Sequence, residues 1–428
     1  MFNEGVDIPA VNTVLFLRPT NSMTVFLQQL GRGLRLAEHK DCLTVLDFVA
    51  QSNRKYDFTS RLQSMLGSGS VVMRKEIQNG FPHVPKGCSI QLEEVAQQRI
   101  LDNINARLRR NDFYKEIVSE LYHAADHHVP TLQEFLKAAA VEPRTFYNGT
   151  RTYTRLCAEA GVIPDFAVTA EEEQLRRAIP RMLSIDSPSW LTFLRKAFAQ
   201  LPTVLSETEQ QYLRMWQFTV WGKDYAQAGF ATPLEAIRKL AHLGPLTQEI
   251  CQVLEGQYDS FSVIPKDPVL PYPCALEVYC NYSRDQIFAA LGVNRPDSVR
   301  EGVKYLDDKK TDVFLVTLNK SEKEFSDTTL YEDYSINEWL FHWQSQSTTT
   351  STSKTGQRYI HQNETGNTVL LFVRERKKET NNVAMSFTFL GKAHIVRWSG
   401  SQPMTILYKL DNPIPAKYIT TTDSSGVL

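Results

Sequence analysis

The chain has 428 residues, of which 42% are hydrophobic and 11% aromatic, a composition typical of a globular protein with about two to four domains. Its 47 basic and 48 acidic residues leave a net charge of −1, so any contact with nucleic acid has to be local. The six cysteines lack the spacing of a zinc site, and no signal peptide or membrane-length apolar run is present. These features predict a soluble cytoplasmic protein without a bound metal or a membrane partner.

Residues 1–55 predict a strand, a helix and a second strand, at 13–17, 22–36 and 43–49. The motif Gln28-x-x-Gly31-Arg32-x-x-Arg35 lies in the helix, and Asn3-Glu-Gly-Val-Asp-Ile-Pro9 precedes the first strand. In order and spacing, these segments resemble the last two motifs of a superfamily 2 helicase motor. A parallel sheet normally has several strands and is covered on both faces. We therefore expect this piece of the second RecA-like lobe to expose apolar edges unless a partner or a further segment completes it.

The resemblance implies roles for the matched residues. Arg32 and Arg35 would act as arginine fingers on ATP bound to a partner lobe, with Gln28 helping to position them. Gly5 and Asp7 would couple nucleotide to nucleic acid. The sequence contains no G-x-x-x-x-G-K-[ST] phosphate loop and no D-E-x-[DH] magnesium site. We therefore expect ATP and Mg²⁺ to bind only if the missing motor lobe is supplied, and no ATP hydrolysis by this chain alone.

The middle of the chain predicts a linker at 56–92 and a helical domain at 93–258. Within this domain, a helix, a tight turn and a second helix fit a helix-turn-helix, in which Arg144 and Arg151 would contact DNA. An ordinary helical hairpin with solvated arginines is the alternative. His123 and His127 share a helix face, but no third ligand converges on them, so we predict no metal site there.

A proline cluster at 265–273 precedes a β-rich domain at 275–420. The pattern predicts a capped helix at 282–292 and strands at 312–318, 368–373, 387–390, 394–398 and 404–407. This region resembles the uncharacterised domain that follows the motor in bacterial fusions of a phospholipase-D-like nuclease with a superfamily 2 helicase, some beside restriction genes. The resemblance is carried by stretches such as Arg300-Glu-Gly-Val-Lys-Tyr305, Phe341-His-Trp-Gln-Ser-Gln-Ser-Thr348 and Gly356-Gln-Arg-Tyr359. The predicted fold class is multidomain α+β: a partial RecA-like α/β lobe, a helical middle domain and a β-rich C-terminal domain.

Aromatic, amide and basic side chains gather in this domain in a combination able to stack on a base and hydrogen-bond its edge. The candidate nucleic-acid contacts are His342, Trp343, Gln344, Gln346 and Arg358.

Two other interpretations stay open. Trp343 alternates with Phe341, so both could lie on the core face of a strand. A metal-dependent nuclease would instead use His342 with acidic residues such as Asp312 and Asp333.

We expect a DNA-binding C-terminal portion of a helicase-like protein, active in bacterial restriction or phage defence. Its partners would be DNA and the missing N-terminal helicase and nuclease domains, or an equivalent separate subunit. The alternative is a protein-interaction module that docks to a separate motor or nuclease subunit. Salt separates the two, because phosphate contacts weaken steeply with ionic strength and apolar docking does not.

Overall fold

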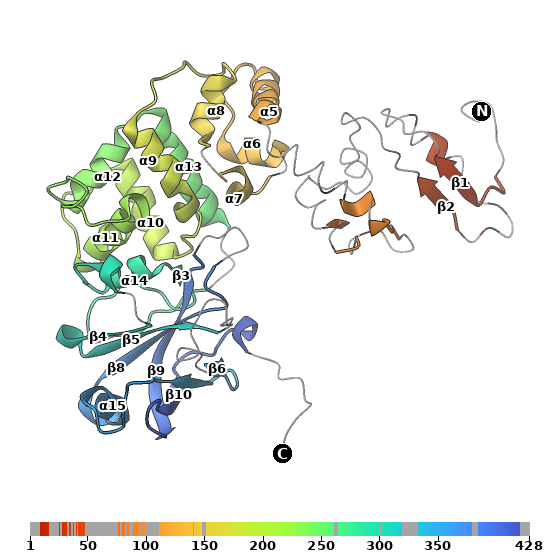
Figure 1. Cartoon of the computed structure of the whole chain (residues 1–428). Helices are drawn as coiled ribbons and strands as arrows, with labels where there is room; N and C mark the ends of the chain where they lie inside the picture. The colour runs from red at the N-terminus through yellow and green to blue at the C-terminus, as the bar shows by residue number, and fades with distance from the viewer. Residues whose placement is uncertain are drawn as a thin grey trace. The chain divides into compact units, whose positions relative to one another are not determined.

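A computed structural model describes the chain at residues 9–16, 25, 28–31, 34–35, 37, 40, 42–47, 76–77, 79–81, 84, 89–94, 96–98, 101, 111–139, 141–147, 151–260, 264–299, 302–318, 333–378 and 384–419. It divides into two compact units, Met1–Phe166 and Ala167–Leu428 (Figure 1). The boundary falls inside the range expected for one helical domain. Helices and a large mixed sheet confirm the multidomain α+β class. Within the described ranges, no helix is long and apolar enough to cross a bilayer.

The first unit begins with a parallel strand pair, β1 (Thr13–Phe16) and β2 (Thr44–Asp47). Residues 28–31, between them in sequence, are helical. Leu15 lies opposite Leu46 in the register, and these side chains are 53% and 46% exposed. About half of the surface of these two leucine side chains is therefore accessible to solvent.

After the partly described residues 76–101, the described part of the first unit forms the helices α5 (Asn111–Ala124), α6 (Leu132–Ala139), α7 (Pro143–Phe146) and α8 (Tyr153–Glu159). They surround an aromatic cluster, in which the Phe146 ring centroid lies 5.4 Å from that of Tyr114 and 5.0 Å from that of Phe135. Helix α7, in the segment predicted to form the second helix of a helix-turn-helix, is a single turn. A recognition helix needs several turns to follow a groove, so α7 alone cannot act as one.

The second unit opens with five helices: α9 (Ala170–Met182), α10 (Pro188–Ala199), α11 (Glu207–Trp221), α12 (Pro233–Ala241) and α13 (Pro245–Asp259). Helix α11 starts at a capping box between Ser206 and Glu209 and stops at Gly222, whose φ of 67° suits a residue without Cβ. It contacts α9, α10 and α12 and is buried over most of its length, so it is the central helix of this layer.

The remaining chain forms one mixed sheet in the order β4-β5-β8-β9-β10-β7-β6, with β3 paired to β9. The strands are β3 (Asn281–Tyr282), β4 (Val303–Leu306), β5 (Thr311–Thr317), β6 (Tyr334–Ser335), β7 (Leu340–Gln344), β8 (Thr368–Arg374), β9 (Phe387–Ser399) and β10 (Thr405–Leu410). The pair β5 and β8 is parallel, and the other pairs are antiparallel.

Strand β9 spans two segments that the sequence predicts as separate strands, 387–390 and 394–398. The predicted break contains Gly391, whose φ is 95° and whose added Cβ would come within 2.9 Å of the Asn412 side chain. A register shift against β8 at this point absorbs the irregularity, so the strand continues instead of ending.

Helix α14 (Arg284–Ala290) packs along α11 and lies between the helices and the sheet (Figure 1). Polar contacts join the two layers. The Asp186 carboxylate accepts a hydrogen bond from the Asn281 backbone N–H at 2.7 Å, and Gln286 Nε2 donates to Thr219 Oγ1 at 2.8 Å. The helical layer and the sheet thus form one compact unit.

Candidate nucleic-acid interface

Burial along the strands separates a covered part of the sheet from an open part. Nearly every residue of β5 and β8 is buried, as in strands covered on both faces. In β7 and β10, buried residues alternate with residues that are partly or largely exposed. Helix α15 (Lys354–Ile360) contributes Tyr359 to the core on one side, where Phe314 stacks on Trp343 with ring centroids 4.2 Å apart. On the other side of β6, β7, β10 and the C-terminal half of β9, the described residues include exposed side chains, such as Tyr334, Arg397 and Lys409, and half-buried ones, such as His342 and Leu407.

The strand registers align side chains in rows across this side. Tyr334 pairs with His342, His342 with Leu407, and Leu407 with Arg397, so one row crosses four strands. Residues paired in this way share a face of the sheet. The Tyr334 and His342 rings are stacked, with centroids 4.5 Å apart and planes inclined by 16°. We call the open sheet face the set Tyr334, Leu340, His342, Gln344, His394, Arg397, Ser399, Thr405, Leu407 and Lys409.

Positive charge predominates on the open sheet face. Arg397 and Lys409 are exposed, and among the residues that the structure describes neither forms an ion pair. Nearby, the Asp411 carboxylate contacts His394 Nε2 at 2.9 Å and Lys392 Nζ at 3.2 Å. Arginine and lysine can contact phosphates, while amide and aromatic groups contact bases. The face therefore combines both kinds of group.

The candidate nucleic-acid contacts of the β-rich domain lie partly on the open sheet face and partly in the core. His342 and Gln344 lie on the open sheet face, whereas Gln346 is half-buried just after β7. Trp343 is 3% exposed and lies in the core with Phe341, so its ring cannot stack on a nucleotide in this conformation. Sequence reasoning missed Arg397, Lys409 and Leu407 as members of the face. The pairings of β10 with β7, which join them to His342 and Leu340, span more than fifty residues.

Arg358 extends from α15 on the core side of the sheet. Its guanidinium donates to both oxygens of the buried Asp312 carboxylate, at 2.8 and 2.9 Å, and lies 3.8 Å above the Tyr305 ring. Asn367 Nδ2 donates a third hydrogen bond to Asp312, at 2.8 Å. Burial, aided by the Asp312 charge, raises the pKa of Tyr359 beside this cluster. Asp312 is thus engaged with protein groups.

The residues matched to the helicase motor lie in the first unit. Gln28 and Arg35 are exposed, and the Arg35 carbonyl accepts a hydrogen bond from Lys40 Nζ at 2.9 Å. Gly5, Asp7 and Arg32 fall outside the described residues. The structure therefore describes only two of the five positions to which the resemblance gives a role.

The predicted DNA contacts of the helical segment also lie in the first unit. Arg144 is exposed on α7. Arg151 donates from Nε to Asn111 Oδ1 at 2.7 Å and lies 5.3 Å from the Tyr114 ring centroid, so it ties the start of α8 to α5. The rings of His123 and His127 are 5.3 Å apart, but the described ranges hold no group of three residues suited to a metal ion.

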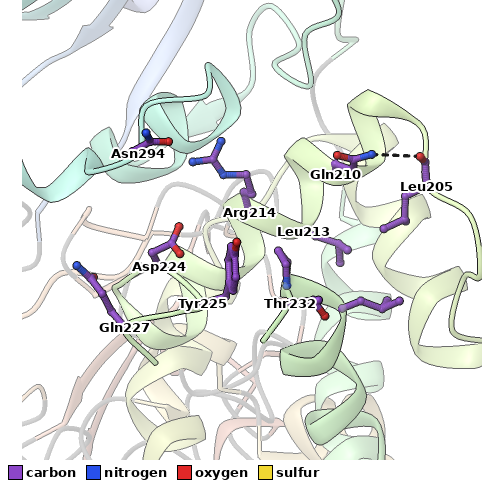
Figure 2. Close-up of a pocket in the computed structure, with 11 residues that line it drawn as sticks. Leu205, Gln210, Leu213, Arg214, Asp224, Tyr225, Gln227, Thr232 and Asn294 are labelled. Atoms are coloured by element: carbon purple, nitrogen blue, oxygen red, sulfur yellow. Dashed lines mark hydrogen bonds between the residues drawn. The ribbon is translucent and has the colours of Figure 1, made fainter. Parts of the chain in front are cut away.

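The second unit also contains a cleft of about 720 Å³ between α11, the start of α12 and the loop after α14 (Figure 2). Arg214 lies on its wall and donates from Nη2 to the Val293 carbonyl at 3.1 Å. Asp224 and Tyr225 come from the loop that joins α11 to α12, and apolar side chains such as Leu213 complete the lining. The volume suits a small molecule. No sequence pattern predicts the cleft, because its walls come from three separated segments.

Two comparisons with known proteins show what parts of this chain are similar to. Residues 276–421 match the model of a domain of unknown function, DUF3427. A region of 127 residues, 29% of this chain, is 31% identical to "Putative ATP-dependent helicase IRC3" of Saccharomyces cerevisiae and spans 17% of that protein. Together these matches support a helicase-associated domain in the C-terminal part of the chain.

Proposed function

We propose that this helicase-related chain binds DNA through the open sheet face and acts with a superfamily 2 motor. The observation that carries the proposal is the row of Tyr334, His342, Leu407 and Arg397 across four adjacent strands. Cations at the end of such a row can bind phosphates, and the aromatic and amide groups beside them can contact bases. Arg358 and Trp343 are left out of the proposed surface because both serve the core.

The finer parts of the proposal rest on the resemblance seen in the sequence. Cytoplasmic DNA in restriction or phage defence would be the substrate, as in the nuclease and helicase fusions that the C-terminal region resembles. Arg32 and Arg35 would contact ATP only beside a lobe that carries the phosphate loop and Mg²⁺. That lobe, and a nuclease domain, would be the partners.

Salt dependence of DNA binding tests the proposal. We expect affinity, measured by fluorescence anisotropy of labelled DNA, to fall linearly with salt on logarithmic axes. The double variant Arg397→Ala and Lys409→Ala should weaken binding and reduce the slope by about 1 for each phosphate that the protein no longer neutralises. Arg238→Ala with Lys223→Ala removes the same charges from exposed positions off the sheet and should change neither quantity. Equal effects of the two double variants would refute the assignment of the face.

A protein-interaction module is the second candidate, favoured by the exposure of the paired Leu15 and Leu46 on β1 and β2. Apolar side chains at the surface of a small strand pair can be covered by a partner subunit. Such docking would depend little on salt. Absence of DNA binding at low salt would favour this candidate.

A further inference from the structure

We infer that the open sheet face takes single-stranded rather than duplex DNA. The inference rests on the proposed function, because it names the form of DNA that the same surface accommodates. It is argued from the width of the face, from the stacked aromatic pair and from the position of the cations.

The width of the face argues against entry into the major groove of undistorted B-DNA. Adjacent strands are separated by about 4.8 Å, so a face of four strands spans about 14 Å before side chains are added. The major groove of B-DNA is about 12 Å wide and admits a helix or a two-stranded ribbon. Strands β6, β7, β10 and β9 lie side by side in one sheet and cannot enter it together. A flexible single strand can instead lie across all four.

The stacked pair argues for unpaired bases. Tyr334 stands on the edge strand β6, is 40% exposed, and has one ring face against His342. In a duplex the faces of each base are covered by its neighbours, so only its edges can be reached. A base in a single strand can add its face to the aromatic stack, whatever its identity.

The cations lie where a strand crossing the sheet would carry its phosphates. Arg397 ends the row that begins at Tyr334, and Lys409 lies beside it on the neighbouring strand β10. The aromatic end and the cationic end of the row are thus separated by Leu407, an apolar side chain. A DNA strand that crosses the row could place a base against the aromatic end and a phosphate against the cationic end. The positive charge of Arg397 and Lys409 complements the negative charge of that phosphate.

Anisotropy titrations of the full chain with labelled oligothymidylate and with a blunt duplex of equal length test the inference. We expect the single strand to bind at least about tenfold more tightly than the duplex. Tyr334→Ala should weaken single-strand binding about fivefold to a hundredfold and leave duplex binding unchanged, whereas Tyr334→Phe, which keeps the ring, should retain it. Trp339→Ala is the matched control, because Trp339 is 39% exposed and lies outside the face.

Each outcome bears on one claim. Equal or tighter binding of the duplex, or single-strand binding that Tyr334→Ala leaves intact, would overturn the inference while DNA binding itself stood. Failure to bind either form at low salt would overturn the proposed function as well. Circular dichroism of Tyr334→Ala and Trp339→Ala checks that both variants keep the fold. If Tyr334→Ala does not fold, the comparison of single strand with duplex on the wild-type chain still decides the inference.

Discussion

At the scale of single residues, Arg358 and His342 show that residues with similar sequence surroundings can have different structural environments. Both stand near aromatic residues in the chain, and both were candidates for nucleic-acid contact. Their surroundings differ because β7 alternates between two faces, whereas Arg358 reaches a buried carboxylate from a helix 46 residues away in sequence. The type of each side chain indicates which contacts it can make. Its position in the fold, set by strand pairing and helix packing, determines which contact it makes.

The Asp312 cluster yields a stability prediction. Asp312→Ala leaves Arg358 and Asn367 without their shared acceptor, and breaking a buried pair in this way costs about 3–5 kcal/mol. Urea denaturation should show this loss in the free energy of unfolding. Asp308→Ala, at an exposed ion pair with Lys309, should cost less than about 1 kcal/mol. A loss at position 312 as small as that at position 308 would contradict a structural role for the cluster.

Asp186 yields a prediction about pH. Burial raises the pKa of Asp186 to about 6 from its usual 3.8, although Asn281 donates hydrogen bonds to the carboxylate. The folded state therefore holds this proton more tightly than the unfolded state. The resulting stabilisation is fully present below about pH 4 and is lost as pH rises through about 6.

The comparison of wild type with Asp186→Asn measures this effect. Between about pH 4 and 7 the free energy of unfolding of the variant should rise relative to wild type by up to about 3 kcal/mol, since one pKa unit corresponds to about 1.4 kcal/mol. Urea midpoints over this range provide the measurement. A constant difference between the two proteins would show that Asp186 titrates normally.

Arg32 yields a prediction about catalysis. Without a phosphate loop or a magnesium site in the sequence, an arginine finger has no bound nucleotide to act upon. The purified chain should release phosphate from ATP at the background rate, and Arg32→Ala should change nothing. Hydrolysis above background that disappears in Arg32→Ala would show that Arg32 acts on a nucleotide without a further lobe.

At the scale of elements, strand β7 shows what a hydrophobic pattern can and cannot predict. The alternation in Phe341-His342-Trp343 predicts a strand with two different faces. Which face enters the core depends on β10 and on α15, and neither can be deduced from β7 itself. For the same reason the sequence placed β9 correctly but divided it, because a glycine inside a strand looks like a strand end.

Matched tryptophan variants test this account of β7. Trp343→Ala should cost about 3–5 kcal/mol, because it removes the ring stacked on Phe314 and leaves a cavity. Trp339→Ala, at an exposed position just before the strand, should change the free energy of unfolding by about 0.5 kcal/mol or less. Thermal unfolding followed by circular dichroism distinguishes the two. Similar melting temperatures would mean that Trp343 is not a core residue.

At the scale of the whole molecule, the helical layer and the sheet of the second unit depend on each other. Glu277 accepts hydrogen bonds from the hydroxyls of Ser187 and Ser189, and Gln211 bonds the backbone on both sides of Cys274. The sequence predicted both layers, but it placed a boundary between them at the proline cluster. Prolines end helices and strands without showing whether the flanking layers pack together.

Fragments test this mutual dependence. A fragment of residues 167–428 should unfold in one cooperative transition, because a single set of contacts joins its layers. A fragment of residues 264–428 exposes the buried face of α14. It also removes the serine partners of the Glu277 carboxylate and the Thr219 acceptor of Gln286, so it should melt well below the longer fragment or fail to fold. Calorimetry of both fragments gives the answer. Identical melting temperatures would show that the sheet domain is self-sufficient.

The packing of α11 against α14 also has an evolutionary consequence. The matched family begins at residue 276, yet the partners of its first helix lie some seventy residues earlier, on α11. A substitution at Gln286 alters the surroundings of Thr219 and is tolerated only if that position adapts. Proteins that carry this domain should therefore show correlated changes between the two helices, and a domain transplanted without its preceding helices should lose its native surface.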